Sequence, residues 1–256
     1  MPPQQNSGHT QLQILRTFTT LYQLCPEYGG SLILSLGLDT AGAALSIAAN
    51  IAGAVSLAID NDPTNLRDVI RTGACDFVVN TLDEAIRAMK NEVRKRAPLS
   101  VALNADPFIV LAEILERGLS PQMFSTFLQS PHQTPDQANI LSQAAHQFQS
   151  EGTSLIAFSS GQSHPQSTPF TVSDTLLIPF VTDHCWALYT PTFDTPATLR
   201  AFDTRAISLL SEDDKLRRRW LQAAPQILQR ERPHRRALWL TDQEKQILQT
   251  EFTLSL

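Results

Sequence analysis

Residues 31–62 read SLILSLGLDTAGAALSIAANIAGAVSLAIDND and contain the pattern on which the fold depends. Ser31–Leu36 is a short apolar run of strand length, and Ala54–Asp60 is a second such run. The small residues of Ala41–Ala52 between them suit a helix packed closely on a sheet. A strand, a helix and a strand in this order predict the repeating unit of a parallel sheet, joined by a right-handed crossover.

The same alternation continues toward the C-terminus. Phe77–Asn80 and Leu99–Leu103 are typical of a third and a fourth strand. Helices are predicted to begin after three capping signals, at Asp62-Pro63, Thr81–Glu84 and Asp106-Pro107. The sequence therefore predicts an α/β fold, a Rossmann-like doubly wound parallel sheet of at least five strands with Ser31–Leu36 in its centre.

The composition along the chain suggests four parts within one domain. They are an N-terminal tail and helix (residues 1–28), a Rossmann-like core (29–128), variable loops with a helix (129–170) and a C-terminal α/β segment completing the same domain (171–256). In the last part we expect a strand at Leu176–Val181 and an amphipathic helix over Asp213–Arg230. Pro225 is expected to kink or split that helix.

Bulk properties exclude several classes of partner. The formal net charge of −5 argues against a nucleic-acid or anionic-membrane surface. No apolar run approaches the roughly 20 residues of a membrane span, and Met1–His9 lacks the pattern of a signal peptide. The three cysteines are Cys25, Cys75 and Cys185, too few and too scattered for a disulfide framework. We expect free thiols and a cytoplasmic location.

The loop after the first strand resembles a dinucleotide-binding fingerprint with one glycine replaced. A G-x-G-x-x-G motif is expected there, with an acidic residue about 20 positions later at the end of the second strand. The candidate cofactor-binding residues are Gly37, Leu38, Asp39, Thr40, Gly42 and Asp60.

Asp39 stands where the fingerprint has its middle glycine, which lets the backbone approach a pyrophosphate. A carboxylate there adds bulk and negative charge. Two interpretations remain open: a working dinucleotide site, or an ordinary helix in which Asp39 or Thr40 is the N-cap. We expect no cofactor to bind tightly, with NAD as the alternative.

At this point the chain resembles the central domain of the urocanases. That family reads G-L-G-G-M-x-G-A-Q, then V-E-V-D, E/R-T-G-x-x-D, L-D-E-A and P-L-S-x-G. The matching segments here are Gly37–Asp62, Arg71–Gly73, Leu82–Ala85, Pro98–Val101 and Glu113–Gly118. Weaker similarity extends over 18–243, where Trp186, Leu216–Leu221 and Arg236–Leu240 resemble F-R-W, L-H-x-W-L and R-I-C-W-L. The resemblance implies a protein that adds water to urocanate with tightly bound NAD as the electrophile.

The departures from the family pattern fall on the parts that carry chemistry. The segment T-D-Q-T-S-A-H-D is replaced by Ser125–Gln129. The family arginine that would hold the substrate carboxylate falls at Cys185, and its active-site cysteine falls at Leu238. An apolar Leu238 cannot supply thiol chemistry, and Cys185 cannot form a bidentate pair with a carboxylate.

Two functions therefore remain. The first is a non-catalytic module that binds a nucleotide-like ligand or a partner chain; the alternative is a divergent NAD-dependent urocanate hydratase. Family members are longer, so surfaces covered in them would be exposed here, and we expect a homodimer with no nucleic-acid or membrane partner.

Other chemistry-bearing residues have plainer interpretations. Asp183-His184-Cys185 offers ligand types, but adjacent strand residues point to opposite faces, so no metal site is expected. Cys25 and Cys75 lack a motif and suit small apolar packing. The basic triplets Arg217–Arg219 and His234–Arg236 are expected to lie on solvated surfaces.

Overall fold

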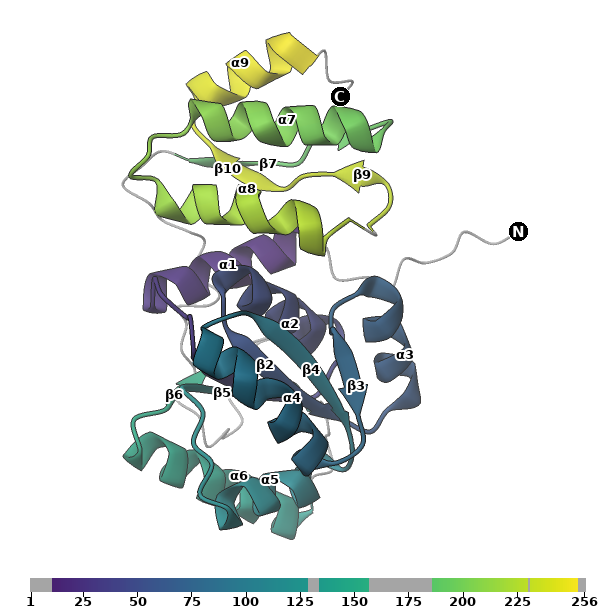
Figure 1. Cartoon of the computed structure of the whole chain (residues 1–256), viewed down its shortest axis with the longest axis vertical. Helices are drawn as coiled ribbons and strands as arrows, with labels where there is room; N and C mark the ends of the chain where they lie inside the picture. The colour runs from purple at the N-terminus through teal and green to yellow at the C-terminus, as the bar shows by residue number, and fades with distance from the viewer. Residues whose placement is uncertain (1–10, 129–133, 157–185, 230, 253–256) are drawn as a thin grey trace, which may run out of the picture.

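Strand β1 (Leu32–Leu36) lies inside a six-stranded parallel sheet in the computed structural model, which describes residues 11–128, 134–156, 186–229 and 231–252 (Figure 1). The sheet order is β3-β4-β2-β1-β5-β6. The other strands are β2 (Val55–Asp60), β3 (Phe77–Val79), β4 (Leu99–Asn104), β5 (Met123–Thr126) and β6 (Ser154–Ile156). All neighbouring strands pair in parallel, which confirms the predicted fold class.

The strand order sets which face each helix covers. The chain first moves outward from β1 to β2 and β3, and then returns through β4 to β5 and β6. Because crossovers are right-handed, this reversal moves the connecting helices to the other face of the sheet. One face carries α1 (Gln11–Leu24), α2 (Thr40–Ala52) and α3 (Pro63–Thr72); the other carries α4 (Leu82–Lys95), α5 (Pro107–Glu116) and α6 (Pro135–Ser150).

Local capping signals mark the helix boundaries. Asp62 caps α3 with Pro63 in the first turn, and Thr81 and Glu84 form the capping box of α4. Helix α6, the helix expected within 129–170, begins at Pro135 because Thr134 caps it. The capping predictions are confirmed for α3, for α4 and for α5, whose N-cap is Asp106.

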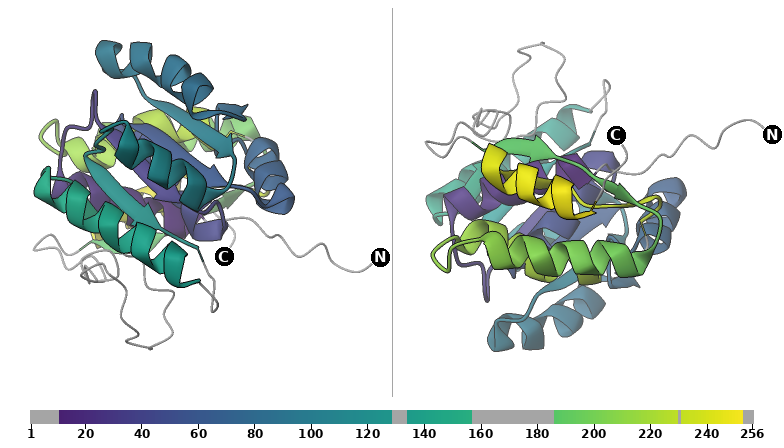
Figure 2. Two further views of the ribbon diagram at one scale, coloured as in Figure 1. Left: turned by 90° about the horizontal axis from the view of Figure 1, so that it is seen from below. Right: turned by 90° about the horizontal axis from the view of Figure 1, so that it is seen from above.

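The C-terminal segment forms a further layer on the α1 and α2 side (Figures 1 and 2). Its elements are β7 (Ala187–Tyr189), β8 (Thr192–Phe193), α7 (Pro196–Leu209), α8 (Lys215–Ile227), β9 (His234–Arg235), β10 (Leu238–Leu240) and α9 (Asp242–Phe252). Its strands make two antiparallel pairs, β7 with β10 and β8 with β9, and do not extend the parallel sheet. The expected strand at Leu176–Val181 lies outside the described residues.

Helix α8 joins this layer to the core. Trp220 of α8 lies against Phe18 of α1, with ring centroids 5.6 Å apart, in the apolar cluster that the two parts share. Pro225 does not split the helix, which ends soon after at Ile227. The core and the C-terminal layer are therefore packed together through a continuous apolar interior.

Within the described part of the chain, no helix has both the length and the hydropathy needed to cross a lipid bilayer.

Candidate functional site

The predicted site residues meet at the carboxyl end of β1. This strand has β2 on one side and β5 on the other, so the topology switches direction here, and open α/β sheets bind ligands at such points. The loop runs from Gly37 to Gly42, and Asp60 ends the neighbouring strand β2. Leu38 is buried in the loop, and Thr40 is exposed as the first residue of α2.

Both glycines are needed for the strand-to-helix turn itself. Gly37 has φ +92°, and its N–H donates to the Ile59 carbonyl at 2.8 Å. A Cβ on Gly42 would lie 2.2 Å from the carbonyl oxygen of Gly37, which no side chain tolerates. These glycines therefore follow from close packing of the loop on the helix and do not by themselves indicate a ligand.

Asp39 caps helix α2. Its Oδ1 accepts hydrogen bonds from the N–H groups of Ala41 at 3.0 Å and Gly42 at 2.9 Å. N–H groups at this position of a helix have no carbonyl partner within the helix, and in dinucleotide sites they bind phosphate. Asp39 is therefore the N-cap of α2, as the second of the two interpretations supposes.

Asp60 is also engaged by the protein. It is buried, and its carboxylate accepts from the N–H of Leu38 at 2.6 Å, the N–H of Asp62 at 2.7 Å and Nδ2 of Asn65 at 2.9 Å. A ribose-binding carboxylate uses the same oxygens to accept from sugar hydroxyls. Here it ties the loop after β1 to the start of α3.

Phe127 was missed by the sequence analysis as a residue of this loop. It follows β5, is buried, and donates its N–H to the Leu36 carbonyl at 2.7 Å. A Cβ on Gly37 would lie 3.1 Å from its carbonyl carbon, and one on Gly42 would lie 3.3 Å from its ring. Phe127 falls in Ser125–Gln129, the segment that departs from the family pattern. That departure is the sequence signal that could have pointed to Phe127.

These contacts do not fit a dinucleotide pyrophosphate. Asp39 occupies the N–H groups of Ala41 and Gly42 and adds a negative charge, while Phe127 packs against the glycines. A phosphate at this helix end would have to displace the capping carboxylate. The ligand-binding role of these residues therefore has no support from the loop geometry.

The C-terminal positions that resemble family motifs form a buried structural unit. Leu238 is buried on β10, and Arg236 makes a bidentate ion pair with Asp203 at 2.8 and 2.9 Å. Burial raises the pKa of Asp203, and the Arg236 guanidinium opposes that shift. Trp220 donates from Nε1 to the Ala237 carbonyl at 2.8 Å. Cys185 lies outside the described residues.

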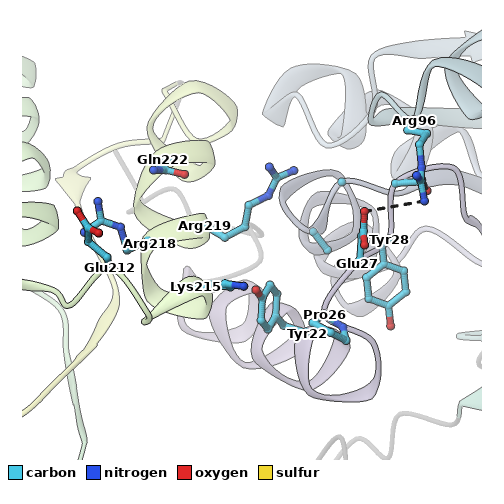
Figure 3. A pocket seen from close by; sticks show the side chains of 13 residues that line it. Tyr22, Pro26, Glu27, Tyr28, Arg96, Glu212, Lys215, Arg218, Arg219 and Gln222 are labelled. Carbon is cyan, nitrogen blue, oxygen red and sulfur yellow. Dashed lines mark hydrogen bonds and ion pairs between the residues drawn. The ribbon is translucent and has the colours of Figure 1, made fainter.

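The basic triplet on α8 is less solvated than expected. Arg219 reaches back to the core and donates from Nε to the Ile51 carbonyl at the end of α2, at 2.7 Å (Figure 3). Arg218 donates to the Leu210 carbonyl at 3.1 Å. The interpretation as a solvated face is wrong here, because the backbone carbonyls of α2 and α7 recruit these guanidinium groups.

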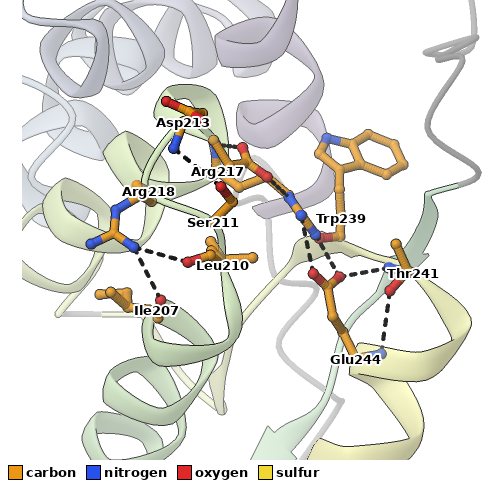
Figure 4. Close-up of polar contacts among 10 residues, drawn as sticks. Ile207, Leu210, Ser211, Asp213, Arg217, Arg218, Trp239, Thr241 and Glu244 are labelled. Atoms are coloured by element: carbon orange, nitrogen blue, oxygen red, sulfur yellow. Dashed lines mark hydrogen bonds and ion pairs between the residues drawn. The ribbon is translucent and has the colours of Figure 1, made fainter.

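Arg217 is the most buried of the three. It pairs with Asp214 at 2.5 Å and with Glu244 at 2.6 Å, and Figure 4 shows the pair with Glu244. Its guanidinium also lies over the Trp186 ring, 4.2 Å from the ring centroid. Burial alone would raise the pKa of Glu244, but the hydrogen bond from Arg217 and the backbone donor of Thr241 outweigh it, so this pKa is lowered. The network fastens α8 to α9 across the small sheet.

Cys75 is not an activated nucleophile. Burial raises the pKa of Cys75 to about 12, with a further contribution from Asp76. Cys25 donates from Sγ to the Glu27 carbonyl at 3.2 Å. Across the described ranges, no group of three or more histidine, cysteine or acidic side chains is placed to hold a metal ion, and 183–185 lie outside those ranges.

Comparison with known proteins gives one family match. Residues 10–149 match the family model described as the urocanase Rossmann-like domain. Among solved structures, a short chain alcohol dehydrogenase from E. coli CFT073, crystallised with NADH, is 11% identical with a TM-score of 0.33. That match covers 65% of this chain and 39% of the dehydrogenase chain. At this TM-score it carries no argument about the site.

Proposed function

The chain belongs to the urocanase family, as a divergent member, and from this premise we propose that it is a non-catalytic binding or interaction module. It keeps the family's Rossmann-like domain without hydrating urocanate. The observation that carries the proposal is the Asp39 carboxylate on the N–H groups of Ala41 and Gly42.

The electrostatic cost to a bound pyrophosphate is large. Two like charges about 4 Å apart repel by about 4 kcal/mol at an intermediate dielectric constant. That corresponds to roughly a thousandfold loss of affinity. Since Asp39 also takes the two donors that would compensate a phosphate charge, the loss is not offset at this helix end.

The positions that resemble the family's substrate-binding and catalytic residues also support a non-catalytic function. Leu238, at the position that resembles the family's active-site cysteine, is buried in β10 and has no ionisable group. The neighbouring Arg236 is held by Asp203 in a bidentate pair. Cys185, at the position of the family arginine that would hold the substrate carboxylate, carries no guanidinium. A reaction that needs a cationic anchor and a thiol finds neither at Cys185 and Leu238.

Calorimetric titration of NAD into the wild-type chain and into Asp39→Gly and Asp39→Asn tests the proposal. We expect no tight binding by the wild type. Asp39→Gly should gain affinity by up to about a thousandfold, because it removes both the charge and the competing acceptor. Asp39→Asn is the matched control: it removes the charge but keeps an N-cap acceptor, so its gain should be smaller.

A urocanate absorbance assay on the same three proteins completes the experiment. No turnover is expected from any of them, since Asp39→Gly restores neither a thiol nor a substrate anchor. Micromolar NAD binding by the wild type would contradict the electrostatic part of the proposal. Urocanate turnover by the wild type would overturn the non-catalytic assignment and favour the divergent hydratase.

A further inference from the structure

We propose that a small phosphorylated organic molecule binds in a basic cleft at the edge of the sheet opposite to the glycine loop. The cleft has a volume of about 430 Å³. One wall comes from the connection between α1 and β1 and from the C-terminal end of α2, and the other from α8 (Figure 3). The proposal stands independently of the function proposed for the loop.

The cleft concentrates positive charge on a chain whose net charge is −5. Its basic lining residues are Arg96, Lys215, Arg218 and Arg219, and its acidic ones are Glu27 and Glu212. Arg218 is turned toward the Leu210 carbonyl, and Arg96 pairs with Glu27 at 3.9 Å (Figure 3). Lys215 and Arg219 are the cations of the two walls with no carboxylate partner among the described residues. A cleft with this excess of cations attracts an anion.

Two of these cations come from α8 and keep donors for a ligand. Lys215 makes no ion pair within the described residues, and Figure 3 places it beside Tyr22. Arg219 uses Nε on the Ile51 carbonyl, which leaves its two Nη groups. Its charge also offsets the carbonyl end of α2, which would otherwise repel an anion.

Arg96 on the opposite wall occupies a strained backbone position. It caps α4 with φ +58°, whereas Gly53 and Gly73 hold the same left-handed position at the ends of α2 and α3. A glycine would adopt this conformation without the Cβ penalty. Strain of this kind is typical of functional sites. The side chain lines the cleft, with Nε donating to the Gly29 carbonyl at 3.1 Å and Nη2 3.9 Å from the Glu27 carboxylate, so its charge is shared with that acid.

The volume of the cleft and the residues that line it limit the class of ligand that can bind there. Small-molecule sites are commonly about 300–1,000 Å³, so this cleft suits a mononucleotide or sugar phosphate better than a dinucleotide. The phosphate would lie between Lys215 and Arg219, where ammonium and guanidinium groups can share its oxygens. The organic part would lie along Tyr22 and Pro26. Burial raises the pKa of Tyr22, which keeps its hydroxyl protonated as a donor.

Calorimetric titration with AMP, and with adenosine as the uncharged match, tests the site. We expect AMP to bind the wild-type chain and adenosine to bind at least about tenfold more weakly, since the phosphate supplies the charged hydrogen bonds. Lys215→Gln should weaken AMP binding about tenfold. The matched control is Lys245→Gln. Lys245 is on α9 and lies over the ring of Tyr189 on β7, so this substitution should leave AMP binding unchanged.

Arg96→Gly separates a ligand role from a structural one. The substitution relieves the left-handed backbone, so thermal unfolding should show a Tm equal to or above that of the wild type. AMP affinity should nevertheless fall several-fold, because one cation of the cleft is lost. An unchanged affinity would show that Arg96 takes no part in binding and would contradict the proposed site.

Further outcomes would overturn the proposal. They are equal affinities for AMP and adenosine, absence of AMP binding at millimolar concentration, and equal effects of Lys215→Gln and Lys245→Gln. The Asp39→Gly variant distinguishes the two edges of the sheet. AMP affinity unchanged by Asp39→Gly supports the cleft, whereas a large gain would assign AMP to the glycine loop.

Discussion

Each end of helix α2 has backbone groups without a partner inside the helix, and the two ends are capped in different ways. At the N-terminus, Asp39 accepts from N–H groups only two and three residues away. At the C-terminus, Gly53 turns the chain, and Arg219 arrives from α8 to bind the Ile51 carbonyl. The first cap is local in sequence, whereas the second exists only once the C-terminal layer has packed on the core.

This difference between the two ends of α2 indicates where the fold can bind an anion. A dinucleotide-binding Rossmann domain leaves the positive end of its first crossover helix for the ligand. Here that end holds an internal carboxylate, and the opposite, carbonyl end is covered by a guanidinium. The charges at both ends of α2 are thus compensated from within, and the excess of cations lies in the cleft beside its C-terminus.

The largest expected effect comes from Gly42→Ala, which tests how closely the loop and α2 approach. Helix propensity alone predicts a gain of about 1 kcal/mol, since alanine favours helices over glycine. The new Cβ would lie 2.2 Å from the Gly37 carbonyl oxygen, so we expect a loss of about 3 kcal/mol in the free energy of unfolding. Urea denaturation measures the difference, and a gain would contradict the close approach.

Arg219→Met is expected to have the next largest effect, because it breaks the distant cap. Methionine keeps an apolar stem but leaves the Ile51 carbonyl without its charged donor. The free energy of unfolding should fall by about 1.5 kcal/mol. The control is Arg232→Met, since Arg232 is exposed and donates to the carbonyls of Gln229 and Glu231 close by in sequence. Equal losses in the two variants would show that the contact with α2 contributes little.

The sequence predicts the strands and helix caps that depend on residues close together in the chain. The strands over 31–104 and the caps at Asp62 and Thr81 are decided by residues within a few positions of each other, and the structure has them. The placement of Gly37 beside Asp60 also follows, because parallel strands bring their carboxyl ends to one edge.

The rest depends on contacts between distant segments. Strand β4 lies between β2 and β3, which no local pattern encodes. Asp60 is held by Leu38 and Asn65, so its role in the turn required the folded geometry. The arginines of α8 look like a solvated triplet in the sequence, because their carbonyl and carboxylate partners lie on other elements.

The smallest expected effect is that of the local cap itself. Asp39→Ala removes the acceptor for the Ala41 and Gly42 N–H groups and should lower the free energy of unfolding by about 1 kcal/mol. Asp39→Asn keeps an acceptor and loses only the charge at the helix end, so roughly 0.5 kcal/mol is expected. Added salt should shrink the difference between wild type and Asp39→Asn, because it screens the charge at a half-exposed position. The loss in Asp39→Ala should largely persist, since a missing hydrogen bond is not screened. Urea unfolding of the three proteins at low and high salt measures both quantities. If Asp39→Asn proved as unstable as Asp39→Ala at every salt concentration, the carboxylate would not act as the simple N-cap that excludes a phosphate from this end of α2.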